Sequence, residues 1–214
     1  MTASDHPLVL QQNTAQKEYS KQYKKMVHKW RHHFYGVIDN IIESHGNVST
    51  PMNFEPLMAY FDGFKITHKS IEAVPQSILD AMRCDDEKAE GWNWINTENA
   101  EILIFFDPSV GTTRQRFTKA HEWAHVVQSF DGEFKADMES IEDDQERSAI
   151  IESVANHFAG YYLVPQSLVL YELRNDPLEL HKPTVNHTAL ACTFGVSEQV
   201  INYRLANVPI KQKQ

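Results

Sequence analysis

Two histidines and a glutamate stand at a spacing that suits a zinc site. Residues 116–125 read RFTKAHEWAH, which places the pattern His-Glu-x-x-His at His121, Glu122 and His125. On a helix, residues four apart differ by about 40° in direction, so both imidazoles would point the same way. Neutral imidazole nitrogens are good ligands for Zn²⁺. Glu122 stands where a general base could act on a water molecule activated by the metal.

A catalytic zinc ion needs a third protein ligand and an open position for water. No third histidine follows closely enough for the longer metzincin pattern. Glu152 lies 27 residues after His125 and would share a helix face with alanines, which allow close approach of a second helix. Spacing alone leaves Glu139, Glu142 and His157 as competing candidates for the third ligand.

The surroundings of the motif favour a functional site over a surface helix. In a chain with 11 histidines, the pattern arises by chance with a probability of roughly a few per cent. The flanking residues are largely apolar, which indicates that much of this helix is buried; they are Phe117, Ala120, Trp123, Ala124, Val126 and Val127. Buried ionisable groups need partners, and a metal ion supplies one.

Hydrophobic periodicity and turn signals predict the elements that position these residues. We expect helices at 18–44, 53–61, 74–82, 112–129, 148–163 and 166–174, and two short helices around Gly195 within 188–206. We expect strands at 64–67, 91–95 and 101–107, the last two paired as a hairpin. Residues 131–147 hold eight acidic and two basic side chains, a composition typical of a solvated connection or the polar end of a helix.

This pattern predicts a mainly helical α+β fold with a small sheet of about three strands. Residues 1–15 are expected to form a flexible tail. Residues 16–175 would form the catalytic domain together with its N-terminal helix, and residues 176–214 a helical extension packed on that domain.

Composition narrows the class of protein. The formal net charge is −9, from 20 basic and 29 acidic residues, so we expect no direct binding to nucleic acid. The two cysteines, Cys84 and Cys192, form no CxxC pair, which fits a reducing cytosol. No secretion signal or membrane-spanning run is evident, so we expect a cytoplasmic protein without membrane contact.

Two motifs together resemble those of a known family. RFTKAHEWAH followed by E-x-x-A-N-x-F-A-x-x-x-L-V-P, beginning at Glu152, resembles the ImmA/IrrE metallopeptidases of bacteria, phages and mobile elements. The closing segment LACTFGVSEQVINYRL is also similar to the end of those proteins. The chain departs from the family pattern at Trp123, where an aliphatic residue is usual, and at Ala124, where glycine is usual. The long N-terminal helix before Pro51 has no counterpart that we can match.

The resemblance implies a zincin-like fold in which His121, His125 and Glu152 bind Zn²⁺ and Glu122 is the catalytic carboxylate. Asn156, one turn after Glu152, would either orient a ligand or take part in ordinary polar packing. Members of this family are antirepressors or stress regulators that cut or inactivate helix-turn-helix repressors. The expected function is therefore site-specific cleavage of such a repressor. The alternative is a non-proteolytic antirepressor that sequesters its partner.

Several other residues have a structural and a functional interpretation. Residues 189–205 match a DNA-reading helix-turn-helix locally, but they carry only one basic residue, Arg204, which favours packing over phosphate contact. Candidates for stabilising the transition state, among which the sequence does not choose, are Arg114, Arg116, Tyr161, Tyr162 and Tyr203. For each of these a role in packing or at the surface is favoured.

Overall fold

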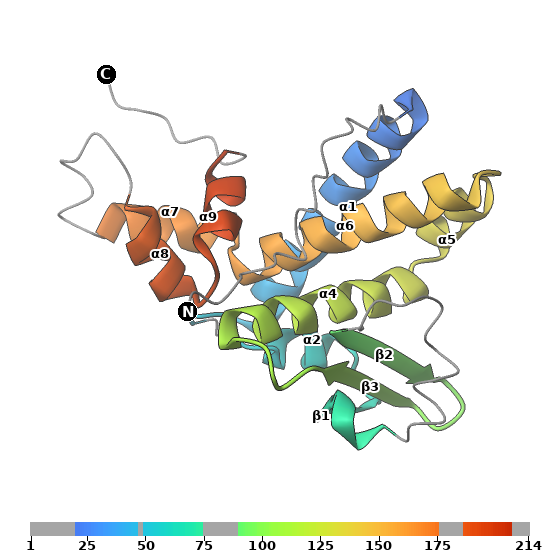
Figure 1. The fold of residues 1–214 in the computed structure, drawn as a ribbon, viewed down its shortest axis with the longest axis horizontal. Helices are drawn as coiled ribbons and strands as arrows, with labels where there is room; N and C mark the ends of the chain where they lie inside the picture. The colour runs from blue at the N-terminus through green and yellow to red at the C-terminus, as the bar shows by residue number, and fades with distance from the viewer. Residues whose placement is uncertain (1–19, 47–48, 75–89, 176–185, 207–214) are drawn as a thin grey trace, which may run out of the picture.

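The computed structural model describes residues 20–46, 49–74, 90–175 and 186–206. Its elements are α1 (Lys21–His45), α2 (Glu55–Tyr60), β1 (Lys65–Ser70), the 3-10 turn η1 (Ile71–Ala73), β2 (Gly91–Asn96), β3 (Glu101–Phe106), α4 (Thr112–Phe130), α5 (Gly132–Glu139), α6 (Asp144–Leu163), α7 (Gln166–Asn175), α8 (His187–Phe194) and α9 (Glu198–Leu205). The fold is mainly helical with one small mixed sheet, which confirms the predicted α+β class (Figure 1).

The core is layered, with α4 and α6 in its middle. α1 packs against α6, α6 packs against α4, and α4 covers strands β2 and β3 (Figure 1). One apolar face of α1 packs into this core, since Trp30, Phe34 and Ile38 are at most 1% exposed. The zinc-motif helix is therefore held between a helix and a sheet.

The sheet has the order β1-β3-β2. β2 and β3 pair antiparallel, which confirms the expected hairpin, and β1 pairs parallel to β3. The hairpin turn is fixed by the Asn96 carboxamide oxygen, which accepts hydrogen bonds from the backbone N–H groups of Glu98 and Asn99. β1 reaches Ser70, beyond the expected end at residue 67, because its pairing with β3 continues to Phe106.

The acidic segment 131–147 is more ordered than the sequence indicates. It forms α5, and α6 begins at Asp144, four residues before the expected start. Asp131 and Asp143 are the N-caps of these two helices, where their carboxylates accept backbone N–H groups. Phe134, Met138 and Ile141 anchor the segment in the core. Two of the acidic residues, Asp131 and Asp143, therefore start helices here, which the composition of the segment did not indicate.

Some expectations lie outside the described residues. The tail at 1–15 and nearly all of the helix expected at 74–82 fall there, as do the two ends of the expected extension at 176–214. The division into tail, catalytic domain and extension therefore stays a prediction. Among the helices that the structure describes, none is both long enough and apolar enough to cross a membrane.

Helix α9 is attached to α1 and α6 through a buried arginine. Arg204 is 1% exposed and donates from Nε to the carbonyl oxygen of Val164 at 3.1 Å. Its guanidinium carbon lies 4.4 Å from the ring centroid of Tyr161, which in turn stacks on Tyr35 at 4.0 Å. Cation–π contact and the hydrogen bond compensate for burial of the charge. The described C-terminal helices thus pack on the body of the protein.

His157 of α6 lies in the same contact region, against Tyr35 of α1 and Tyr203 of α9. Its pKa predicts that the folded state is less stable in acid. Burial, with the nearby charges of Arg31, Arg204 and His32, lowers the pKa of His157 from 6.5 to about 4. The folded state therefore binds fewer protons than the unfolded state between those values. The contribution of His157 to the free energy of unfolding is therefore full above about pH 6.5 and is lost as the pH falls towards 4.

We expect His157→Gln to show a smaller loss of unfolding free energy than the wild type when the pH is lowered from about 7.5 to about 5. Urea denaturation at both pH values measures this. Some slope remains because burial also lowers the pKa of His68 to about 4. An undiminished slope in His157→Gln would contradict the assignment.

Close packing of α4 on α6 predicts that the interface does not tolerate larger side chains. Ala124 of α4 and Ala155 of α6 are both fully buried. Ala155→Leu should reduce the free energy of unfolding by about 1–3 kcal/mol because the extra atoms force the two helices apart. Urea denaturation compares it with Ser148→Leu, at an exposed position of the same helix, which should change stability little.

Candidate metal centre

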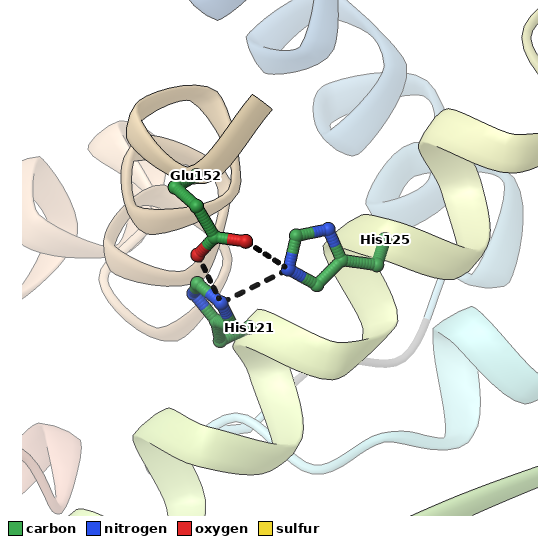
Figure 2. A group of neighbouring side chains, drawn as sticks. All are labelled: His121, His125 and Glu152. Atoms are coloured by element: carbon green, nitrogen blue, oxygen red, sulfur yellow. Dashed lines mark hydrogen bonds and ion pairs between the residues drawn. The ribbon is translucent and has the colours of Figure 1, made fainter. Parts of the chain in front are cut away.

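Helices α4 and α6 bring His121, His125 and Glu152 together. The two histidines lie one turn apart on α4, with their Nε2 atoms 3.0 Å from each other. Glu152 projects from α6, with one carboxylate oxygen 3.2 Å from His121 Nε2 and the other 3.4 Å from His125 Nε2 (Figure 2). Within the described part of the chain this is the one group of three or more such ligands whose ligand atoms converge.

These separations suit a zinc ion. With bonds of about 2.0–2.1 Å to tetrahedral Zn²⁺, neighbouring ligand atoms lie about 3.3 Å apart. The two Nε2 atoms, 3.0 Å apart, are close to that spacing, and each of them has a different carboxylate oxygen of Glu152 at 3.2 or 3.4 Å. Two imidazole nitrogens and one carboxylate also match the donor set of catalytic zinc sites. His121, His125 and Glu152 therefore fit the metal that the motif implies.

Each histidine is oriented through its other ring nitrogen. Nδ1 of His121 lies 3.1 Å from the amide oxygen of Asn156, and Nδ1 of His125 lies 3.0 Å from that of Gln128. Donation of Nδ1–H to these oxygens leaves each Nε2 without a proton, which is the form that binds a metal. Gln128 is itself 4% exposed and donates to the carbonyl oxygen of Ile151 on α6.

The charges of the site favour a cation. Burial by itself lowers the pKa of His121, but its hydrogen bond to Glu152 and the carboxylates of Glu122 and Glu152 outweigh this and raise it. Burial and the charge of His121 lower the pKa of His125. Burial opposes ionisation of Glu152, yet the two histidines lower its pKa overall. The carboxylates of Glu122 and Glu152 act to raise the pKa of both histidines against the effect of burial, so they favour a positive charge at this site, which a metal ion would supply.

Glu122 lies beside the three ligands, held by strand β2. It is 8% exposed, and Asn93 donates to its Oε2 at 2.8 Å. Gly91, on the same face of β2, lets the strand approach, because a Cβ there would lie 2.9 Å from Glu122 Oε1 and 2.3 Å from the Thr118 methyl group. Sequence reasoning missed both Asn93 and Gly91, since neither belongs to a local motif.

A cavity of about 210 Å³ opens beside these groups. It is lined by Glu90, Gly91, Arg114, Phe117, Thr118, His121, Glu122, Glu152 and Asn156. The candidate base and two of the three candidate ligands thus face one space. A peptide group of a substrate bound in this cavity could therefore reach both Glu122 and the ligands His121 and Glu152.

The competing candidates lie elsewhere. Of the other candidates for the third ligand, Glu139 and Glu142 do not join the convergent group, and His157 contacts the hydroxyls of Tyr203 and Tyr35 instead.

Most of the residues considered for stabilising the transition state have other partners. The hydroxyls of Tyr161 and Tyr162 donate to Asp39 and to the carbonyl oxygen of Asn53, respectively. None of the three candidate tyrosines lines the cavity. Arg116 ties α4 to the carbonyl oxygens of Met52 and Gly195, so its role is packing.

The departure from the family pattern at Trp123 affects packing and not the cavity wall. Trp123 is fully buried, stacks on Phe61 and donates from Nε1 to His68 Nε2 at 3.1 Å. It does not line the cavity. Ala124 is also fully buried, where its small side chain still permits close helix packing.

The hydrogen bonds of Asn156 and Gln128 to the histidine Nδ1 atoms predict that both residues strengthen zinc binding. Asn156→Ala and Gln128→Ala should each weaken Zn²⁺ binding about 10–100-fold, because the imidazoles lose the group that fixes their tautomer and direction. Competition with a chromophoric chelator measures the dissociation constants. Asn202→Ala, at an exposed position of α9, is the matched control and should bind Zn²⁺ like the wild type. Equal affinities in all variants would contradict the orienting role.

Comparisons with known proteins identify the family and a similar fold. The model of the IrrE N-terminal-like domain family, peptidase M78, matches residues 84–206. A solved structure described as a Mycobacterium tuberculosis transcriptional regulator has a similar fold, with 15% sequence identity and a TM-score of 0.56. The likeness covers 91% of this chain and 54% of that one, so this chain spans about half the length of the regulator.

Among curated proteins no significant match was found. The family match alone includes α4, α6 and all the residues of the candidate centre from Glu90 onward, and it spans more than half of the 214 residues. The chain therefore belongs to the ImmA/IrrE family of metallopeptidase-like regulators, through its IrrE N-terminal-like domain.

Proposed function

We propose that this protein is a zinc-dependent metallo-endopeptidase that cleaves a helix-turn-helix transcriptional repressor. The observation that carries the proposal is the convergence of His121, His125 and Glu152. Glu122 lines one cavity together with two of these ligands, His121 and Glu152. Two imidazoles and a carboxylate would hold Zn²⁺ and leave a coordination position open.

Bound zinc would supply Lewis-acid chemistry, polarising a peptide carbonyl and making a water molecule more acidic. Glu122 is the group that moves the proton. It takes a proton from the attacking water and delivers it to the nitrogen of the leaving amine when the peptide bond breaks. The hydrogen bond from Asn93 to Oε2 directs the carboxylate and leaves Oε1 for this transfer. Burial of Glu122 limits competition from bulk water.

Two features support a basic DNA-binding protein as the substrate. The family resemblance points to repressors, and the net charge of −9 would attract a partner whose surface is basic. The protein would act in the cytoplasm, where such a repressor meets DNA. Direct DNA binding by residues 189–205 is not part of the proposal, because Arg204, their one basic residue, is buried against Val164 and Tyr161.

Cleavage should depend on Glu122 while zinc binding should not. We expect Glu122→Gln to keep stoichiometric zinc but to cut a co-expressed helix-turn-helix repressor about 10²–10⁴-fold more slowly. Metal analysis and intact-mass spectrometry of the repressor measure the two properties. Glu142→Gln, which changes an exposed carboxylate, is the control and should cleave normally.

Undiminished cleavage by Glu122→Gln would rule out the proposed mechanism. If the repressor is released from its operator without cleavage, and release survives both Glu122→Gln and removal of zinc, the protein is instead an antirepressor that sequesters its partner.

A further inference from the structure

Arg114 and Glu90 form an ion pair within the same cavity that the mechanism leaves unused. Arg114 lies in the first turns of α4, and Glu90 directly precedes β2. Arg114 Nε donates to Glu90 Oε2 at 2.6 Å, with about a fifth of each side chain exposed. Both residues line the cavity together with Glu122 and Glu152.

The pairing between these two side chains is incomplete. An arginine and a carboxylate commonly form two parallel hydrogen bonds. Here only Nε is used, and Arg114 Nη2 is buried without a hydrogen-bond partner. Among the described residues, no hydrogen bond is made by Glu90 Oε1 either. A free donor and a free acceptor therefore belong to one fixed pair, and a buried unsatisfied donor is costly unless a ligand completes it.

Both partners are held in place by the backbone. The carbonyl oxygen of Glu90 accepts from the N–H of Asp107, which continues the pairing of β2 with β3. Arg114, Thr118 and Glu122 follow one another at four-residue steps, so they share a face of α4. From Arg114 to His121 is about 10 Å along the helix axis, which an extended peptide spans in about three residues.

We infer that Arg114 and Glu90 bind an uncharged amide group of the peptide substrate, within about three residues of the bond that is cut. Arg114 Nη2 donates to the amide oxygen, and Glu90 Oε1 accepts the amide N–H. A carboxylate would be repelled by Glu90, Glu122 and Glu152, and an ammonium group would meet Arg114. The amide is either a Gln or Asn side chain or a backbone peptide group. This inference rests on the proposed function.

Tripeptide hydroxamates test the inference by binding to the zinc-loaded protein, without need of the natural substrate. The parent probe carries three alanines. One set places Gln, Glu or Met at each position in turn, and a second set replaces each backbone amide by an ester. Acetohydroxamate reports on the metal alone. Dissociation constants are measured by isothermal titration calorimetry.

At one position we expect the amide to bind about tenfold more tightly than its isosteres, since hydrogen bonds to charged groups are at stake. A preference for Gln over Met and Glu identifies a side-chain amide, and weakening by an ester identifies the backbone. Arg114→Lys keeps the charge but loses Nη2, so the preference should disappear. In Glu90→Gln the unneutralised Arg114 should reverse a Gln preference in favour of Glu. Arg147→Lys is the control, because Arg147 bonds to Ile141 and Asp144 at the start of α6 and does not line the cavity.

Three results would overturn the inference. If zinc-loaded wild type binds acetohydroxamate but discriminates at none of the positions, Arg114 and Glu90 are not a subsite, while the metal centre stands. If Arg114→Lys is folded by circular dichroism and retains the full preference, another residue reads the amide. Absence of any acetohydroxamate binding by the wild type would overturn the zinc centre and the subsite with it.

Discussion

The candidate centre depends on the close approach of α4 and α6, because neither helix holds three ligands by itself. α4 supplies His121 and His125, and α6 supplies Glu152. Metal–ligand distances tolerate deviations of only about 0.2 Å. Buried alanines on both helices, Ala124 and Ala155 among them, allow this approach. Core packing and metal affinity are therefore one physical constraint, and a change that separates the helices would weaken both.

A second constraint acts across α4 from the sheet. β2 lies against α4 through Gly91, and the absence of a side chain there admits Glu122 and Thr118. Asn93, two residues later on the same face, then reaches Glu122. The ligands are thus positioned by one neighbour of α4 and the base by another. This separation explains how Glu122 can lie beside the ligands without joining them.

Local patterns were sufficient for the motif helix, the β2–β3 hairpin and the paired helices around Gly195, because periodicity and turn residues carry those signals. Glu152 needed the family resemblance, since several downstream residues fitted the spacing equally well. Gln128 stands three residues after His125, so helix geometry alone could have indicated it. Asn93, Gly91 and the pair of Arg114 with Glu90 could not be predicted, because they meet α4 or the cavity only through tertiary packing. In residues 131–147, caps at Asp131 and Asp143 outweighed a composition typical of a loop.

The charges of the cavity suggest a division between attraction and recognition. Among the described residues, its lining carries three carboxylates, Glu90, Glu122 and Glu152, and one guanidinium, Arg114. A divalent ion would make this set neutral, whereas the whole chain carries −9. Attraction of a basic partner would then come from the outer surface and weaken with salt, because charges more than about 8 Å apart are screened at physiological ionic strength. Inside the cavity a neutral peptide meets no net charge, so hydrogen-bond geometry decides which segment fits. The proposed protease could in this way attract many basic proteins and still have a narrow substrate specificity.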